Sequence, residues 1–447
     1  MYVADAPSVA ELLAKADAET IGRSLSAAQD PRLSNRYVHW DKLRHLDPPD
    51  GIGSDEWWLR IKISRLADMR PLPLVGATGG APFSYGLPDL VLKRLHHIDQ
   101  RCSGEVAMDE VVTSERQAGQ RFLVNSLMEE AIRSSQLEGA TTSRRVAKEM
   151  LKTGREPKDR SERMIANNYR ALQYMRDEMG KSLSPEAILE LHRIVTEGTL
   201  EDPAAAGRIQ RPGETRVAVY DRDDGRPIHR PPPAEQLPER MRLLCQFANE
   251  SEDDARFVHP VVRAILLHFW LAYDHPFEDG NGRTARILFF WLMRVRGYWL
   301  AEYLPISRFI RNAPAQYARA FMETETDGGD TTYFLAHQLD VIEKAIEDLH
   351  VYLQRKIAEV HDVEQLLDGA QDLNGRQLAL LTDAVRHPDS SFTFASHARN
   401  HRVTHETARS DLSALADRGL MIWRRRGRTY VFEPSPNLGE ILRESPS

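Results

Sequence analysis

The sequence contains few cysteines and no long apolar run. Its 447 residues include two cysteines, Cys102 and Cys245, far apart in the chain. This excludes a disulfide-stapled scaffold, and the pair matches no metal-ligand spacing, so we expect both to be packing residues in a reducing compartment. The most apolar runs, 265–273 and 287–293, are shorter than the roughly 18–20 residues of a membrane span. They predict buried helices and no membrane partner.

The sequence also lacks an excess of positive charge and a recognisable export signal. The formal net charge is -7 at pH 7, which gives no global attraction to nucleic acid or anionic membranes. The N-terminus MYVADAPSVAELLAKADAE has no basic segment followed by an apolar one. We therefore expect a cytoplasmic protein in which any affinity for polyanions is local. The length allows two or three domains.

Breaks in the helical pattern divide the chain. A Pro- and Gly-rich stretch at 71–88 separates an N-terminal segment, which we expect Trp57 and Trp58 to anchor to the main body. At 208–233, alternating residues around an Asp-Asp-Gly turn predict a β-hairpin. A third break near 369–374 follows a long helix expected at 336–367. Periodicity predicts further helices at 114–138, 144–152, 160–178, 185–197, 238–249, 259–274 and 284–297.

A polar insert, HPFEDGNGRTAR at 275–286, lies between two apolar helices, where unpaired charge is costly. Gly280 and Gly282 can both take positive φ, so successive backbone N–H groups could converge in front of the following helix. The helix dipole and the side chains of Arg283 and Arg286 add positive charge at the same point. A bound phosphate would compensate these charges.

The other residues of the insert fit chemistry on a phosphate. Asp279 could share Mg²⁺ with phosphate oxygens. His275, with an unperturbed pKa near 6.5, could accept a proton from a hydroxyl that attacks the phosphate. Phe277 is expected to fasten the loop to the core. A lone His before Pro or a lone GNG is usually structural, but their conjunction between buried helices favours a functional site.

The insert resembles the motif HPFx(D/E)GNGRxxR of the Fic domain family and matches it at each specified position. The resemblance extends upstream through FVHPVVRAILLHFWLAYD and downstream to about residue 349. It implies a mostly helical enzyme that transfers AMP from ATP to a Ser, Thr or Tyr hydroxyl of a target protein. The hairpin would be the family's flap, which docks the backbone of the target as an added strand.

The same resemblance implies a role for each residue of the insert. His275 would be the general base and Asp279 the ligand of Mg²⁺. Arg286 would reach the γ-phosphate, and the neighbouring groups would hold the α- and β-phosphates. The nucleotide site would comprise Phe277, Gly280, Asn281, Gly282, Arg283 and Arg286.

A second stretch, SSQLEGATTSRR at 134–145, interrupts two helices. Ser134 and Glu138 are four residues apart and share a helix face, and Gly139 is a good helix stop. By itself this is an ordinary helix end. Beside the first motif it resembles the family's inhibitory signature (S/T)xxxE(G/N), which implies that Glu138 pairs with Arg286 when ATP is absent. In some relatives such a glutamate orients a water that removes AMP, so both reaction directions stay open.

The C-terminal pattern is helix, strand, helix, turn, helix and two strands, with Thr404 as an expected N-cap. It resembles a winged helix-turn-helix over about 374–434. Such a module would bind DNA through exposed basic groups, or it would recruit a target protein or a second copy of this chain. The candidate DNA contacts are Arg402, His405, Arg409, Arg425 and Arg426, with His401, Arg424 and Arg428 nearby.

The sequence thus predicts a mainly α fold with a Fic-type core, a hairpin flap and a C-terminal α+β winged helix. We expect an N-terminal helical region at 1–113, an inhibitory helix region at 114–158, the catalytic core at 159–350, a linker at 351–372, the winged helix at 373–436 and a tail at 437–447.

Two alternatives remain beside an autoinhibited, ATP- and Mg²⁺-dependent protein adenylyltransferase. The donor could be UTP or GTP, because nothing in the phosphate nest reads the base, and Tyr317 is the one candidate for a base-pocket wall. The other alternative is a DNA-binding transcriptional regulator whose Fic core is a nucleotide sensor.

Overall fold

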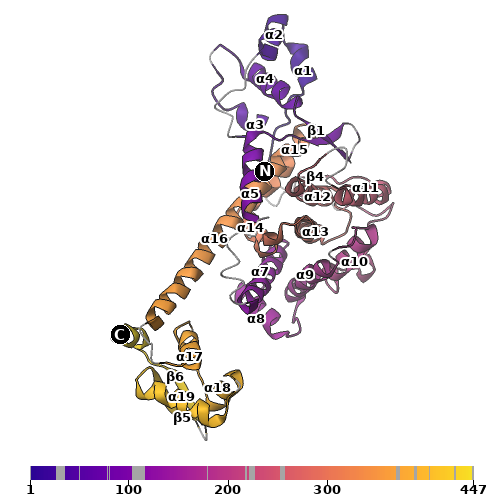
Figure 1. The fold of residues 1–447 in the computed structure, drawn as a ribbon. Coiled ribbons are helices and arrows are strands. Elements are labelled where there is room, and N and C mark those ends of the chain that lie inside the picture. The colour runs from indigo at the N-terminus through magenta and orange to yellow at the C-terminus, as the bar shows by residue number, and fades with distance from the viewer. Residues whose placement is uncertain are drawn as a thin grey trace. The chain divides into compact units, whose positions relative to one another are not determined.

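The computed structural model describes most of the chain, in two units, Met1–Glu347 and Asp348–Ser447 (Figure 1). The described residues are 2–26, 36–49, 51–77, 79, 81–102, 116–178, 180–216, 219–220, 227–251, 257–368, 373–386, 390–401, 403–426 and 429–444. Among the helices of these ranges, none combines the length and apolar character needed to cross a membrane.

The N-terminal segment combines helices with a hairpin that the sequence analysis did not predict. Its elements are α1 (Val9–Lys15), α2 (Ala18–Ser26), α3 (Trp40–Leu43), α4 (Ser54–Leu66), β1 (Arg70–Val75), β2 (Pro82–Tyr85) and α5 (Asp89–Cys102). Strands β1 and β2 pair antiparallel, with Arg70 opposite Tyr85. The stretch 71–88 therefore forms in part an antiparallel ribbon within a region that is otherwise mostly helical in its described residues.

Polar contacts join this segment to the rest of the first unit. Trp57 and Trp58 are buried in the segment's own apolar cluster. The link itself is made by Lys62 Nζ, which lies 2.7 Å from Asp327 Oδ1, and by Arg65, which donates to the Tyr333 hydroxyl at 2.8 Å. Trp57 and Trp58 thus pack within the segment itself, and the predicted link to the main body is made by these polar contacts.

The central body contains every helix that periodicity predicted. These are α7 (Arg116–Leu137), α8 (Arg144–Thr153), α9 (Arg160–Asp177), α10 (Pro185–Thr196), α11 (Leu237–Asn249), α12 (Pro260–Asp274) and α13 (Asn281–Val295), followed by α14 (Ile306–Asn312), α15 (Pro314–Thr326) and α16 (Thr332–Asp368). Side-chain caps fix several starts, as Asp159 does for α9 and Ser184 for α10. Short 3-10 turns lie at Pro203–Ala205, Ala234–Gln236 and Trp299–Tyr303.

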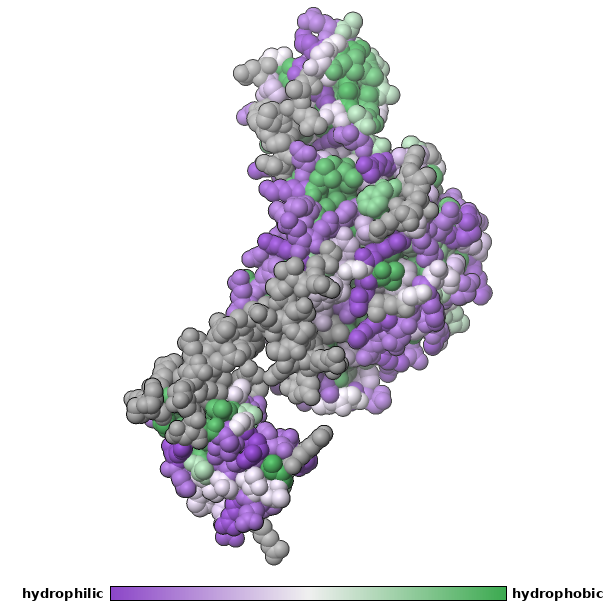
Figure 2. All heavy atoms as spheres, in the orientation of Figure 1, coloured by the Kyte–Doolittle hydropathy of each residue, from purple (hydrophilic) through white to green (hydrophobic). Residues whose placement is uncertain are grey.

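Helices α12 and α13 form the centre of this body and lie side by side (Figure 1). Both are apolar on nearly every face, which is typical of a helix buried all round. Leu267, Phe269, Leu288 and Leu292 are almost completely buried, and each such side chain contributes roughly 1.5–3 kcal/mol of burial free energy. The face around α9 and α10 in Figure 2 is mostly hydrophilic. Because α12 and α13 are both buried, the loop between them is held by two packed helices.

The predicted flap hairpin is present. Strands β3 (Val219–Tyr220) and β4 (Pro227–His229) pair antiparallel, with Val219 opposite His229. Residues 217–218 and 221–226 of this hairpin lie outside the described residues. Cys102 and Cys245 are buried free thiols, as expected of packing residues, and burial raises the pKa of each to about 12.

The second unit contains α17 (Gly375–Arg386), α18 (Phe394–His401), α19 (His405–Asp417), β5 (Met421–Arg426), β6 (Thr429–Pro434) and α20 (Leu438–Glu444). Strands β5 and β6 pair from Met421 opposite Pro434 to Arg426 opposite Thr429. Phe392 forms a single bridge to Phe432. The side chain of Thr404 caps α19, as predicted, by accepting from the Thr407 N–H.

The long helix expected at 336–367 is present as α16, which also runs through 351–368, the stretch assigned to a linker in the expected domain division. This stretch is therefore helical. The expected tail at 437–447 contains α20, whose Leu438 and Leu442 pack in the apolar core of the second unit.

Candidate active site

The motif loop connects two unusual backbone positions. At the end of α12, His275 has φ 46° and ψ 52°, and it is the one non-glycine with positive φ among the described residues. Such a conformation costs about 1–3 kcal/mol. Gly280 has φ 86°, and α13 begins directly after it at Asn281, which is earlier than predicted. Gly282 consequently lies in the first helical turn, and the prediction that it has positive φ was wrong.

The missing side chain at Gly282 nevertheless leaves space for the ends of two other side chains. A Cβ at this position would collide with Glu138 Oε1 and would lie 3.0 Å from a guanidinium nitrogen of Arg286. The absence of a side chain therefore lets a carboxylate approach the start of α13. A phosphate could approach the same backbone.

Asn281 and Phe277 fasten the loop to itself. The Phe277 N–H donates to Asn281 Oδ1 at 2.9 Å, and Asn281 Nδ2 donates to the Phe277 carbonyl at 2.8 Å. Phe277 is completely buried, as expected of an apolar anchor. Both ends of the Asn281 amide are thus used within the loop.

The hydrogen bond of His275 defines which ring nitrogen is available. Nδ1 lies 3.3 Å from the Ala272 carbonyl, and since a carbonyl only accepts, Nδ1 must carry the hydrogen. Nε2 then has a free lone pair. Burial lowers the pKa of His275 to about 4, with the charges of His229 and Arg216 acting in the same direction. The ring is therefore neutral near pH 7 and can accept a proton.

Arg216 connects the base of the flap to the turn at His275, and the sequence analysis gave it no role. Its guanidinium donates to the carbonyls of Asp274 at 2.7 Å and His275 at 3.1 Å. It also donates to the Pro232 carbonyl at 2.9 Å and to the Gln210 side chain. These contacts offset the cost of the left-handed backbone at His275.

Arg283 is a buried cation whose hydrogen-bonding capacity is only partly used. Its side chain is fully buried, and Nη1 donates to the Val195 carbonyl at 3.1 Å. Nη2 lies 3.4 Å from Asp279 Oδ1. Nε and Nη2 have no hydrogen-bond acceptor, which is costly for a buried charged group. An anion such as phosphate fits this arrangement because it would supply the missing acceptors.

Asp279 is half-exposed at the edge of the site. Its Oδ1 accepts from the Gly280 N–H at 2.6 Å, and its Oδ2 lies 3.2 Å from an exposed guanidinium nitrogen of Arg160. In the part of the chain that the structure describes, no three His, Cys, Asp or Glu side chains converge to hold a metal. Magnesium would therefore take most of its ligands from phosphate oxygens and water, which is usual for this ion.

The two motifs meet at Arg286. This arginine is 1% exposed, and its Nη2 lies 2.7 Å from Glu138 Oε1 although the two residues are 148 positions apart. Its Nε donates to Ser134 Oγ at 2.9 Å, and Nη2 also contacts the Ser134 carbonyl at 3.2 Å. Gly139, with φ 98°, turns the chain directly after Glu138. The structure thus brings the predicted residues Ser134, Glu138 and Arg286 together.

Tyr317, the candidate wall of a base pocket, lies on α15 and is partly exposed. Its hydroxyl lies 3.0 Å from His268 Nε2, and its ring packs edge-on against Phe321. Burial of the phenol group raises its pKa well above the ordinary value. The role of Tyr317 as a base-pocket wall stays a prediction.

The candidate DNA contacts lie on the second unit. His405 is the first residue of α19, and Arg409 on the same helix is exposed, as is Arg425 on β5. Arg402 and Arg428 lie outside the described residues, and so does the side chain of Arg426. Within the described part of this surface, the predicted basic groups are on α19 and β5.

The comparisons with known proteins agree with this geometry. The Fic/DOC family matches residues 182–293. This part of the chain is therefore similar to the Fic/DOC family. It is 36% identical over 121 residues to "Protein adenylyltransferase Fic" of Nematostella vectensis, and 29% identical over 202 residues to "Protein adenylyltransferase Fic" of Drosophila mojavensis. These matches cover 26% and 45% of this chain.

The matches to those relatives span 25% and 35% of their own lengths, so the relationship to protein adenylyltransferases is distant. A crystal structure of a Fic family protein from Desulfovibrio desulfuricans has the same fold. Its TM-score is 0.51 at 18% sequence identity, over 77% of this chain and 94% of that one. The predicted mainly helical Fic fold is thereby confirmed, and the winged helix stays a prediction.

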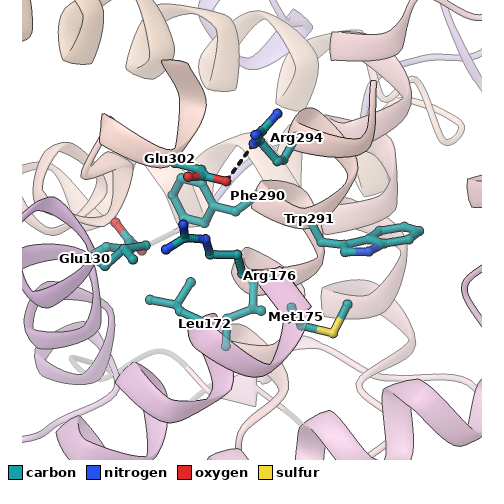
Figure 3. Close-up of a pocket in the computed structure, with 10 residues that line it drawn as sticks. Glu130, Leu172, Met175, Arg176, Phe290, Trp291, Arg294 and Glu302 are labelled. Carbon is teal, nitrogen blue, oxygen red and sulfur yellow. Dashed lines mark hydrogen bonds and ion pairs between the residues drawn. The ribbon is translucent and has the colours of Figure 1, made fainter. Parts of the chain in front are cut away.

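Helix α7 carries a buried acid, Glu130, one turn before Ser134. Its carboxylate accepts from the Ser307 N–H at 3.1 Å and also contacts the Ser307 hydroxyl. Figure 3 shows Glu130 at one side of a largely apolar pocket between α7, α9 and α13. Burial raises the pKa of Glu130 to about 7, although Ser307 and Arg286 oppose this shift.

This shift predicts how stability depends on pH. The pKa of Glu130 is higher in the folded state than in the unfolded state. Its contribution to the free energy of unfolding is therefore fully present below about pH 4.5 and is lost as the pH rises through about 7. Each pKa unit corresponds to about 1.4 kcal/mol. We expect Glu130→Gln to raise the melting temperature at pH 8 and to change it little at pH 5, as measured by scanning calorimetry.

The neighbouring Glu129 provides a matched control of opposite sign. Burial tends to raise its pKa, but hydrogen bonds from Arg144 and Arg133 outweigh burial and lower it. Glu129→Gln should therefore destabilise the protein at pH 8. Equal melting temperatures of wild type and Glu130→Gln at pH 8 would contradict the raised pKa of the Glu130 carboxylate.

Proposed function

We propose that this protein is a protein adenylyltransferase that transfers AMP from ATP to a Ser, Thr or Tyr hydroxyl and that Glu138 holds it inactive. The proposal rests on two buried arginines in the first turns of α13, Arg283 and Arg286. One has unsatisfied N–H groups, and the other is paired with a carboxylate from a distant helix. A polyphosphate is the ligand that satisfies both.

The reaction needs one proton acceptor and an oriented triphosphate. The hydroxyl oxygen of the target attacks the α-phosphorus of ATP while its proton passes to Nε2 of His275. The bond from the α-phosphorus to the oxygen that bridges to the β-phosphorus breaks, and pyrophosphate leaves with the electron pair. Magnesium held by Asp279 would neutralise charge on the phosphates. Arg283 and the first turn of α13 would bind the same oxygens.

Inhibition follows from competition for Arg286. Its guanidinium is fully buried, and Glu138 and Ser134 occupy its N–H groups. A γ-phosphate must displace Glu138 to reach it. The collision of a Cβ at Gly282 with Glu138 also places this carboxylate against the backbone that phosphates would approach. The resting protein would consequently bind ATP weakly, or it would bind ATP in an unproductive pose.

Removing the carboxylate should activate the protein. A charge-assisted hydrogen bond contributes roughly 1.5–3 kcal/mol, so we expect Glu138→Gly to raise nucleotide incorporation at least about tenfold. The measurement is mass spectrometry after incubation with Mg²⁺ and mixed nucleoside triphosphates. The added mass identifies the donor, and the modified peptide identifies the acceptor. An added mass of UMP or GMP would identify UTP or GTP, and not ATP, as the donor.

Glu178→Gly is a suitable control, because Glu178 directly follows α9 as Glu138 directly follows α7. It should leave incorporation at the wild-type level. Unchanged incorporation in Glu138→Gly would remove the proposed inhibition. If wild-type protein removes AMP from modified Glu138→Gly protein, the wild type would instead act in AMP removal.

His275 should govern both the rate and its pH dependence. In the Glu138→Gly background, His275→Ala should lower the rate at least about 10²-fold, whereas the exposed His96→Ala should not. The active form of His275 is neutral, and its pKa is about 4. The value of kcat/KM should therefore stay constant from pH 7 to about pH 5.5 and fall below that. An acid limb at pH 6.5 would contradict the buried environment of this ring.

We further propose that the second unit is a winged helix-turn-helix that binds DNA. The supporting observation is a line of aromatic contacts from α19 to the β5–β6 hairpin. The ring centroids of His405 and Phe394 are 5.5 Å apart, those of Phe394 and Tyr430 6.0 Å, and those of Tyr430 and Trp423 5.5 Å. Trp423 is 54% exposed. Arg409 and Arg425 flank this surface, as nucleic-acid binding requires.

Fluorescence anisotropy of labelled duplex DNA at 50 and 200 mM salt tests this second role. Binding should weaken as the salt concentration rises. Arg409→Ala and Arg425→Ala should each reduce the slope of log binding constant against log salt concentration by about one. Arg145→Ala, in the first unit, should not. Salt-independent anisotropy would favour the alternative that this unit contacts a protein or a second copy of the chain.

A further inference from the structure

His192 is a buried histidine beside the motif loop that the proposed chemistry does not use. It lies in the last turn of α10 and is completely buried. Its Nε2 lies 2.8 Å from the Asp279 carbonyl, and its Nδ1 lies 3.0 Å from the Gly207 backbone nitrogen. Its ring is stacked on Phe277, with centroids 3.7 Å apart and planes within 6°. The ring thus contacts the loop on two sides.

The partners of the ring fix its protonation. The Gly207 N–H can only donate, so Nδ1 must be an acceptor without a hydrogen. The Asp279 carbonyl can only accept, so Nε2 must carry the hydrogen. His192 is therefore a neutral imidazole with one defined tautomer. Burial lowers its pKa to about 4, and Arg283 acts in the same direction.

Helix α10 also supports the neighbouring residues of the loop. A Cβ at Gly280 would lie 2.8 Å from Thr196 Cγ2 and 3.4 Å from His192 Nε2, so a glycine is needed for the loop to lie this close. Arg283 donates to the Val195 carbonyl at 3.1 Å. The final turn of α10 is consequently the surface on which residues 277–283 rest.

We propose that His192 is a positioning residue that fixes the peptide of Asp279, and thereby the carboxylate that would hold magnesium, relative to Arg283. This inference rests on the proposed function. The hydrogen bond and the ring stack act together, because one fixes the carbonyl of Asp279 and the other fixes Phe277 two residues earlier. Loss of such a supporting contact typically costs about 10–100-fold in metal affinity or activity.

Two substitutions in the Glu138→Gly background separate these contributions. His192→Phe keeps a stacked ring and loses both hydrogen bonds. His192→Gln keeps an amide donor for the Asp279 carbonyl and loses the stack. We expect His192→Phe to raise the magnesium concentration for half-maximal incorporation about tenfold or more and to lower kcat. His192→Gln should retain more magnesium affinity than His192→Phe. Glu190→Ala, on the exposed side of α10, is the matched control.

Two readouts do not depend on activity. Hydrogen exchange of peptides covering 276–283 and 205–209 should be faster in His192→Phe than in Glu190→Ala. Imidazole ¹⁵N shifts of the His192 signal, assigned by its absence in the variants, should show hydrogen on Nε2 at pH 7. Hydrogen on Nδ1 would overturn the inference whatever the magnesium dependence of the variants.

The outcomes also distinguish this inference from the proposed function. Failure of the Glu138→Gly parent to incorporate any nucleotide, in the presence of folded protein, overturns the proposed function and with it the catalytic part of this inference. An active parent whose His192→Phe variant has the magnesium dependence and kcat of Glu190→Ala overturns the positioning role alone. Faster exchange with unchanged magnesium dependence would assign His192 to stability only, which also overturns it.

Discussion

The burial of two guanidinium groups, those of Arg283 and Arg286, is the constraint on which the rest of the site depends. Both are at most 1% exposed, and a buried charge is tolerated only when it is paired and hydrogen-bonded. Arg286 is compensated by Glu138 and Ser134 from α7. Removing one partner of such a pair typically costs about 3–5 kcal/mol. Because of this cost, the Glu138 carboxylate must either stay paired with Arg286 or be replaced there by another anion.

Arg283 meets the same constraint in a different way. Its contacts to Val195 and Asp279 leave two nitrogens without an acceptor. The fold accepts this cost because the loop before α13 is held by other contacts. Asn281 closes the loop on itself, Arg216 holds the carbonyls on both sides of the His275 turn, and His192 holds the Asp279 carbonyl. The site is therefore rigid before any ligand binds, which reduces the cost of binding one.

The sequence predicted those features that depend on local pattern. The apolar helices around the loop and the hairpin follow from periodicity, and the meeting of Glu138 with Arg286 followed from the resemblance of two short motifs. Features that depend on neighbours distant in sequence were not predictable. Gly282 leaves space for the Glu138 carboxylate and does not have a positive φ, and only the packing of α7 against α13 reveals this. His192 and Arg216 have no motif of their own.

Glu130 on α7 and Glu138 directly after this helix differ in how they can pair with Arg286. Glu130 and Glu138 are eight residues apart and both interact electrostatically with Arg286. Glu130 is already satisfied by Ser307, and burial raises its pKa to about 7, so near neutral pH much of it is uncharged. It is therefore a weak competitor for the guanidinium. In the proposed inhibition, the strongest remaining partner for Arg286 after Glu138 moves away would be an incoming phosphate, and not the Glu130 carboxylate. A single ion pair would thus control access to the site.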